Sequence, residues 1–257
     1  MEERSLKKEI SLFMATMLVC GNMIGSGVFM LPSTLAQVSG PGATIIAWII
    51  TTIGSILIAI SFANLGTKYP STGGAYQYTK EAFGDFAGFL SAWLYWNGSW
   101  IGNAAIIVAI TSYASAVIPA LSNPMISIIF SSAILWIFTI VNILSVKIAG
   151  KLQSFVTIFK IGFFALFIIV AFLNFDNVNI LPLFPEGKGL STVPLAATST
   201  LWAFIGLESA TVAAGEIKNP EKNIRKSTIY GLIIASVIYL AISIASMGAM
   251  DNKTLAN

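Results

Sequence analysis

The first long apolar segment of this chain is interrupted at its middle by glycine and polar residues. Residues 21–29 read Gly-Asn-Met-Ile-Gly-Ser-Gly-Val-Phe, and a second apolar segment is interrupted around residues 200–209. Lipid offers backbone amides and carbonyls no hydrogen-bond partner, so unwound backbone at membrane depth persists only where it faces protein or a water-filled cavity. The two interruptions therefore predict discontinuous membrane helices that enclose a binding site.

The composition is that of an integral membrane protein. Of the 257 residues, 56% are hydrophobic and only 10% are charged, which is far from the composition of soluble domains. The chain contains no histidine and one cysteine, Cys20, so it offers neither a disulfide framework nor a zinc site. We expect no cofactor, no metal ion and no nucleic-acid partner; the expected partners are the lipid bilayer and a small molecule.

Hydropathy predicts seven membrane spans. They cover residues 12–36, 43–66, 86–117, 125–145, 152–173, 194–216 and 229–250. The third is long for a hydrocarbon core of about 30 Å, which predicts a strong tilt or an extension past the headgroups. The interruptions fall in spans 1 and 6, which correspond to each other if five-helix repeats are inverted in the membrane. Residues 12–173 would then form the first repeat, and residues 194–250 would begin the second.

Positive charges on the connections predict the orientation. With residues 1–11 as a cytoplasmic N-terminus, eleven lysines and arginines face the cytoplasm: Arg4, Lys7, Lys8, Lys68, Lys80, Lys147, Lys151, Lys218, Lys222, Arg225 and Lys226. Only Lys188 and Lys253 then lie outside. We therefore predict that residues 1–257 form one multi-pass domain of the cell membrane.

Two charged residues lie well inside the apolar spans. Lys160 is in span 5 and Glu208 is in span 6. Lys160 is about 12 Å into its span by helical rise, which is further than a lysine side chain comfortably reaches toward the headgroups. A charge at this depth is costly, so each residue must face a partner or a cavity. Both are functional candidates, and the sequence leaves open whether they pair with each other.

Helix packing is the alternative explanation for the first interruption. Gly21 and Gly25 form a G-x-x-x-G pattern, which is common where membrane helices pack closely. Packing does not explain Asn22, Ser26 and Gly27 beside them, nor the second interruption. The dipole ends and freed amides of broken helices suit a carboxylate, while freed carbonyls suit an ammonium. An amino acid carries both groups.

Several segments in a fixed order carry a family resemblance. They are residues 21–29, residues 70–76, Tyr95 and Trp96 with residues 100–103, and residues 201–210 running on to 218–220. Together they resemble the amino acid, polyamine and organocation (APC) superfamily of permeases, and within it the bacterial arginine/agmatine-type basic amino acid antiporters. The resemblance implies an all-α, LeuT-like inverted-repeat fold that works by alternating access, with helices 1 and 6 discontinuous.

The resemblance also implies roles for individual residues. The substrate's amino acid backbone would lie at the two breaks, and the residues implied there are Asn22, Met23, Gly25, Ser26 and Gly27. The residues implied to line the side-chain pocket are Gly98, Ser99, Asn103 and Ile106. Trp202 and Ile205 match positions that close over the substrate. Tyr95 and Glu208 match gate residues, and Glu208 is also the implied pH-sensitive group.

Lys160 departs from the arginine/agmatine antiporters, which lack a lysine in span 5. It resembles the lysine of several sodium-independent or proton-coupled permeases, whose ammonium replaces a sodium ion and bonds the unwound carbonyls of span 1. Glu208 favours a cationic substrate, but a nearby Lys160 would offset its field. The leading hypothesis is an exchanger of cationic amino acids or related amines. A sodium-independent or proton-coupled permease for small neutral amino acids remains the alternative.

Other classes of protein fit less well. A seven-helix receptor or retinal protein typically has its N-terminus outside and its retinal lysine in the last helix. Here the predicted N-terminus is cytoplasmic and Lys160 lies in span 5. No G-x-S-x-G elbow, metal-ligand cluster or paired carboxylates appear in the spans, so we expect no enzyme. The family fold needs ten core helices, so we expect either a fragment of a longer permease or a short protein completed by a second chain. The sequence leaves open whether the protein forms a homo-oligomer.

Overall fold

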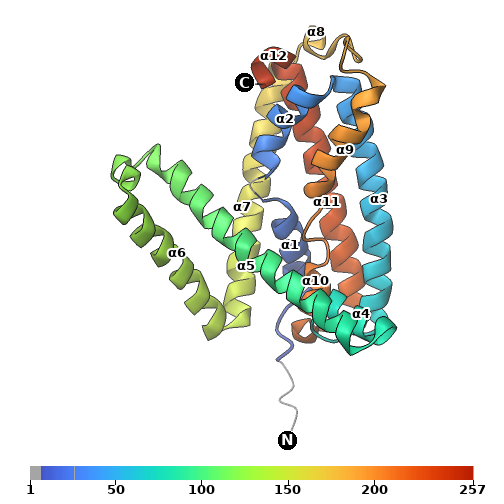
Figure 1. The fold of residues 1–257 in the computed structure, drawn as a ribbon, viewed down its shortest axis with the longest axis vertical. Helices are drawn as coiled ribbons and strands as arrows, with labels where there is room; N and C mark the ends of the chain where they lie inside the picture. The colour runs from blue at the N-terminus through green and yellow to red at the C-terminus, as the bar shows by residue number, and fades with distance from the viewer. Residues whose placement is uncertain (1–6, 26, 257) are drawn as a thin grey trace, which may run out of the picture. The chain divides into compact units, whose positions relative to one another are not determined.

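The computed structural model describes residues 7–25 and 27–256, which form helices and no strand (Figure 1). This confirms the predicted all-α class. The longer helices are α1 (Leu12–Met23), α2 (Gly27–Val38), α3 (Pro41–Lys68), α5 (Asp85–Ser115), α6 (Pro124–Leu144), α7 (Val146–Leu173), α9 (Val193–Trp202) and α11 (Pro220–Ala249). The shorter ones are α4 (Ala75–Phe83), α8 (Asn177–Ile180), α10 (Ser209–Val212) and α12 (Asn252–Ala256).

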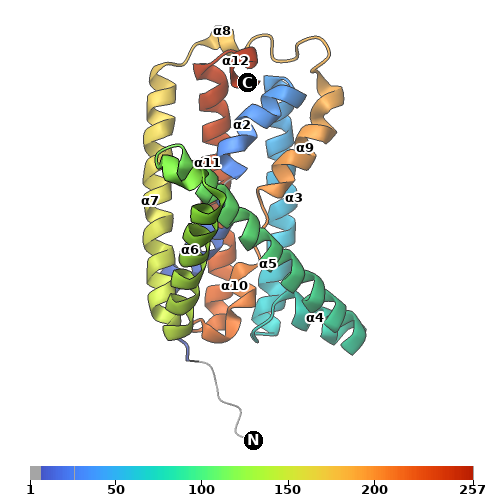
Figure 2. The same cartoon turned by 60° about the vertical axis from the view of Figure 1, so that its left-hand side comes forward.

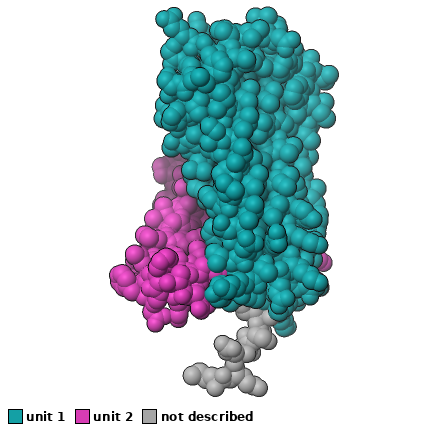
Figure 3. All heavy atoms as spheres, turned by 90° about the vertical axis from the view of Figure 1, so that its right-hand side faces the viewer, with its two compact units in different colours: residues 1–74, 152–257 teal, residues 75–151 magenta. Residues whose placement is uncertain are grey.

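The chain divides into two compact units, which are coloured separately in Figure 3. Unit 1 comprises Met1–Gly74 and Leu152–Asn257, and unit 2 comprises Ala75–Lys151. Both helix interruptions predicted from the sequence belong to unit 1, together with most of α7.

Five helical segments in the described part of the chain are long and apolar enough to cross a membrane. They are Leu12–Val38, Pro41–Lys68, Pro124–Leu144, Val146–Leu173 and Pro220–Ala249. The chain is thus a multi-pass membrane protein. The predicted third and sixth spans are not among these five. Helix α5 has 31 residues, but polar residues such as Asn97 and Asn103 lower its mean hydropathy. Helices α9 and α10 are each too short, because the backbone between them is not helical. Seven spans stay a prediction.

Unit 1 is built around α11, which packs along both α1 and α3, while α9 packs on α3 (Figures 1 and 2). Small residues permit these close contacts, as is common between membrane helices. A Cβ atom on Gly231 of α11 would lie 2.7 Å from the Val19 side chain of α1. Trp48, Phe204 and Tyr239 are the largest fully buried side chains of the described residues, and they lie beside the two helix breaks.

One end of unit 1 is closed by α8, α12 and the segment between α8 and α9 (Figure 1). The Lys188 ammonium donates to the carbonyl of Ala36, in the last turn of α2, and to Asn252 Oδ1 at 3.1 Å. A cation at this position also complements the negative end of the α2 dipole. These contacts hold α12 and the loop against α2, the second half of the first broken helix.

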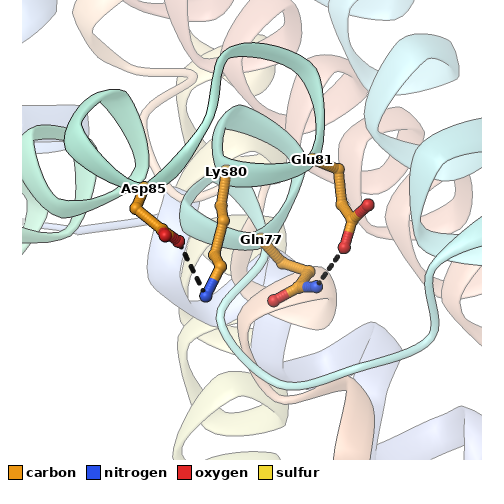
Figure 4. Close-up of polar contacts among 4 residues, drawn as sticks. All are labelled: Gln77, Lys80, Glu81 and Asp85. Atoms are coloured by element: carbon orange, nitrogen blue, oxygen red, sulfur yellow. Dashed lines mark hydrogen bonds and ion pairs between the residues drawn. The ribbon is translucent and has the colours of Figure 1, made fainter.

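Unit 2 contains α4, α5 and α6. Gly84 separates α4 from α5 with a φ of +86°, a left-handed conformation that glycine adopts without strain. Across this turn Lys80 pairs with Asp85 at 3.0 Å, and within α4 Gln77 donates to Glu81 at 3.1 Å (Figure 4). The hydrogen bond to Asp85 raises the pKa of the Lys80 ammonium. Both partners are exposed, so the pair orients the turn more than it stabilises the fold.

Candidate functional site at the two helix breaks

The first break lies between α1 and α2. In an unbroken helix the Gly21 carbonyl would accept the amide of Gly25, but here that amide donates to the Met23 carbonyl at 2.8 Å. Lys160 of α7 supplies the missing donor: its Nζ lies 2.9 Å from Gly21 O and 2.7 Å from Ile24 O. The ammonium thus satisfies two carbonyls that the end of α1 leaves without helical partners, and its charge complements the α1 dipole.

Close packing of α7 on α1 makes this contact geometrically feasible. A Cβ atom on Gly21 would lie 2.2 Å from Thr157 Oγ1 and 2.5 Å from Gln153 Nε2, so only glycine fits there. Thr157 is fully buried, and its hydroxyl donates to the Met17 carbonyl at 3.2 Å. Because Thr157 and Lys160 are three residues apart on α7, they present neighbouring groups to the same helix.

The second break, between α9 and α10, is a series of turns. Gly206 has a φ of +106°, and its amide donates to Glu208 Oε2 at 3.1 Å. The hydroxyl of Ser209 lies 2.6 Å from the Gly206 carbonyl and accepts a hydrogen bond from Asn22 Nδ2 at 2.8 Å. A side chain from the first break is therefore bonded directly to the second break.

Tyr239 of α11 provides a further link between the two breaks. Its hydroxyl lies 2.6 Å from the Met23 carbonyl and 3.0 Å from the Ala203 carbonyl. A tyrosine hydroxyl has one proton, so the two carbonyls share it. The ring is 1% exposed, stacks on Trp48 at 5.3 Å and meets Phe204 edge to face at 5.9 Å. Tyr239 is not among the residues predicted from the sequence, although a phenol deep in an apolar span needs a partner and could have been singled out for that reason.

The structure brings together the predicted site residues that belong to unit 1. Asn22, Met23, Gly25 and Gly27 lie at the first break, and Trp202, Ile205 and Glu208 lie at the second. Trp202 approaches the start of α2, because a Cβ atom on Gly27 would lie 3.0 Å from its ring. Ser26 falls outside the described residues.

The remaining predicted site residues lie in unit 2. Tyr95, Gly98, Ser99, Asn103 and Ile106 all belong to α5. Gly98 and Ser99 are adjacent and the other spacings are three or four residues, which places all five along one face of that helix. Their arrangement around a substrate stays a prediction.

A pocket of about 290 Å³ adjoins the second break. Its lining comes from α3, from the end of α9 and from the segment between α9 and α10: Ser55, Ile58, Phe62, Leu201, Phe204, Ile205, Leu207 and Glu208. Within the described part of the chain, the buried Ser55 hydroxyl has no hydrogen-bond partner. The pocket thus combines a carboxylate and a hydroxyl with an otherwise apolar wall.

The arrangement suits an amino acid chemically. The N-terminus of α2 presents the positive end of a helix dipole to the first break, which favours a carboxylate. Carbonyl oxygens at a helix break favour an ammonium, and at the first break the ammonium of Lys160 already binds two of them, those of Gly21 and Ile24. The two breaks are bonded to each other through Asn22 and Tyr239, so they form one candidate site.

Comparison with known proteins agrees with this geometry. Residues 10–257 match the model of a family described as amino acid permease. The chain belongs to the amino acid permease family. The predicted membership of the APC superfamily is confirmed, and this is a family of transporters rather than enzymes.

Relatives of this permease support the predicted subgroup. The cadaverine/lysine antiporter of Escherichia coli K12 is 34% identical over 258 residues, covering 98% of this chain and 56% of the antiporter. The arginine/ornithine antiporters of Latilactobacillus sakei and Pseudomonas aeruginosa are 32% and 31% identical, covering 100% and 94% of this chain and 56% and 52% of their own lengths. The permease chain thus spans about half the length of the curated relatives it matches.

Replacing Gly206 with alanine is expected to lower the stability of the permease by about 2 kcal/mol or more. The φ of +106° strains any L-residue, and the new Cβ would lie 3.0 Å from the backbone carbon of Asn22. Thermal unfolding of the purified protein measures the effect. Gly162→Ala on α7 is the matched control, because no neighbouring atom lies within 4 Å of the position that its Cβ would take. Equal melting temperatures for both variants would contradict the described break.

Proposed function

We propose that the protein exchanges cationic amino acids or related amines across the cell membrane by alternating access. The observation that carries this proposal is the direct bonding of two helix breaks, through Asn22 to Ser209 and through the shared Tyr239 hydroxyl. Two discontinuous helices that meet in this way are typical of secondary transporters, whose substrates bind at the breaks. The relatives named for cadaverine, lysine, arginine and ornithine support a cationic substrate.

In this proposal the substrate's amino acid backbone binds at the breaks, with Met23, Ser26 and Gly27 around its carboxylate and ammonium. Trp202 and Ile205 close over the substrate. Tyr95 and Glu208 act as gate residues, and Glu208 also responds to pH. The side-chain pocket is formed by Gly98, Ser99, Asn103 and Ile106, in a LeuT-like arrangement of inverted repeats.

Lys160 has a structural role in this proposal, because its ammonium occupies the place of a coupling cation. Its bonds of 2.9 and 2.7 Å to the carbonyls of Gly21 and Ile24 are those that a bound cation would otherwise make. We therefore propose exchange that requires no sodium. A small neutral substrate is not favoured, because the relatives whose names state a substrate are named for cationic amino acids and amines.

We further propose a cytoplasmic N-terminus. The basis is the excess of lysine and arginine on the connections assigned to that side, including Lys218, Lys222, Arg225 and Lys226. Cysteine-accessibility labelling at residues 8 and 188 from each side of the membrane would test this orientation.

Counterflow of labelled lysine tests the proposed function. Proteoliposomes containing the complete protein and loaded with unlabelled lysine are expected to accumulate external labelled lysine in sodium-free buffer. Cadaverine, arginine and ornithine should compete at concentrations at which alanine does not. Accumulation that depends on sodium would overturn the role of Lys160, and competition by alanine alone would overturn the substrate class.

A further inference from the structure

An apolar groove runs between α1 and α11 on unit 1. Its volume is about 600 Å³, and its walls are formed by Leu12, Phe13, Thr16 and Met17 of α1 and by Tyr230, Ile233 and Ile234 of α11. The one hydroxyl on its α1 wall, that of Thr16, donates to the Leu12 carbonyl at 2.9 Å. The α1 wall therefore requires no polar ligand, and hydrocarbon is the material that fits it.

Basic residues lie on α11 next to the groove. Lys222 and Lys226 precede Tyr230 by eight and four residues, so the three side chains share one stripe of the helix with Ile233 and Ile234. Both lysines are exposed. Glu221 lies about 100° away around the helix, since each residue turns the helix by that angle. The stripe thus changes from basic to aromatic to aliphatic over about 18 Å of helical rise.

The segment before α1 brings further basic residues to the same end of the groove. Ile10 forms a parallel bridge with Ile217: its amide donates to the Glu216 carbonyl and its carbonyl accepts from the Lys218 amide, both at 2.9 Å. This bridge fixes the chain that carries Lys7 and Lys8 beside the loop that leads into α11. Among the described residues of this region, Glu9, Glu216 and Glu221 are acidic, and none of them lies on the α11 stripe.

We propose that this groove is a binding site for an anionic phospholipid. One acyl chain lies between Phe13, Met17 and Ile233, and the phosphate is held by Lys222 and Lys226 with the Tyr230 hydroxyl below them. The charge pattern decides the occupant: a basic group at the headgroup level of a membrane helix binds anionic headgroups, whereas a lipid without net charge leaves the two ammonium groups uncompensated. The bound lipid bridges α1, the helix that ends at the first break, and α11, the helix that carries Tyr239.

Native mass spectrometry of the complete protein tests this site without any transport measurement. Titration with phosphatidylglycerol and with phosphatidylcholine of identical acyl chains should show tighter binding of phosphatidylglycerol. The double variant Lys222→Gln/Lys226→Gln should weaken phosphatidylglycerol binding about 25-fold, because each basic residue near an anionic lipid contributes roughly fivefold. The control Lys147→Gln/Lys151→Gln removes the same charge from α7, which contributes no residue to the groove, and should leave the affinity unchanged.

A second variant locates the acyl chain. Ile233→Trp fills the groove and should lower the binding of both lipids, while melting temperature reports that the protein is folded. Equal affinities for the two lipids, or equal losses in the two lysine pairs, would overturn the headgroup assignment. Undiminished binding in Ile233→Trp would place the lipid elsewhere, or show that another segment of the protein covers the groove. None of these three results would change the expectation for lysine counterflow, so the proposed function would stand.

Discussion

Replacing Lys160 with methionine is expected to lower lysine exchange at least a hundredfold. Methionine retains an unbranched apolar side chain but has no donor for the carbonyls of Gly21 and Ile24, which Lys160 contacts at 2.9 and 2.7 Å. Hydrogen bonds from a charged donor are each worth about 1.5–3 kcal/mol, so the loss of two corresponds to two or more factors of ten. The initial rate of exchange in proteoliposomes measures the effect.

Two further variants make this result interpretable. Lys151→Met alters the same helix away from the break and should leave exchange within about twofold of the unsubstituted protein, a difference of about 0.4 kcal/mol. Lys160→Arg keeps the charge and the donors, so it should retain more exchange than Lys160→Met. Unimpaired exchange in Lys160→Met, with a normal melting temperature, would show that the ammonium is not needed to hold the first break.

Replacing Tyr239 with phenylalanine is expected to lower exchange by a factor of about ten or more. The variant keeps the ring that packs on Trp48 and Phe204 and removes only the hydroxyl shared by the carbonyls of Met23 and Ala203. A buried acceptor left without its partner costs about 1–3 kcal/mol, and 1.4 kcal/mol is a factor of about ten. Exchange rate and melting temperature should be measured on the same preparation.

The matched control for Tyr239 is Tyr113→Phe. Tyr113 lies on α5 and is 61% exposed, so the loss of its hydroxyl should change neither exchange nor melting temperature. If Tyr239→Phe and Tyr113→Phe both exchange lysine at the unsubstituted rate, the two breaks do not depend on α11 for their alignment.

The breaks themselves were predictable from local sequence. Helix α1 ends at Met23 and α2 begins at Gly27, inside the interval of glycine and polar residues at 21–29 that predicted an interruption. Helix α9 ends at Trp202 and α10 begins at Ser209, in the same way. The glycine cluster weakens the first helix through backbone freedom alone, whereas the second interval contains one glycine, Gly206, followed by the polar residues Glu208 and Ser209. Neither signal requires tertiary information.

The partners of the site residues were not predictable from local sequence. The cost of burying Lys160 required a partner or a cavity, but only the packing of α7 on α1 selects the carbonyls of Gly21 and Ile24. The carbonyls that Tyr239 contacts are 216 and 36 residues away in the chain. Such contacts depend on which helices become neighbours, and hydropathy does not encode that choice.

Some membrane spans were predictable from local sequence and others were not. Uniformly apolar helices such as Pro41–Lys68 were predicted well, because length and hydropathy suffice. The predicted third and sixth spans are harder, since one carries polar residues along α5 and the other contains the backbone break. In both segments, the polar residues or the backbone break that make the segment a candidate for the site also weaken its hydropathy signal.

Sodium-free counterflow of labelled lysine, measured in parallel for the unsubstituted protein and for Trp202→Leu, tests the central claim most directly. The claim is that the two bonded breaks form one site for a cationic amino acid. It predicts accumulation by the unsubstituted protein and by the control Trp136→Leu, and loss of accumulation in Trp202→Leu. Accumulation that is unchanged in Trp202→Leu, or that is absent from the unsubstituted protein under every sodium condition, would contradict it.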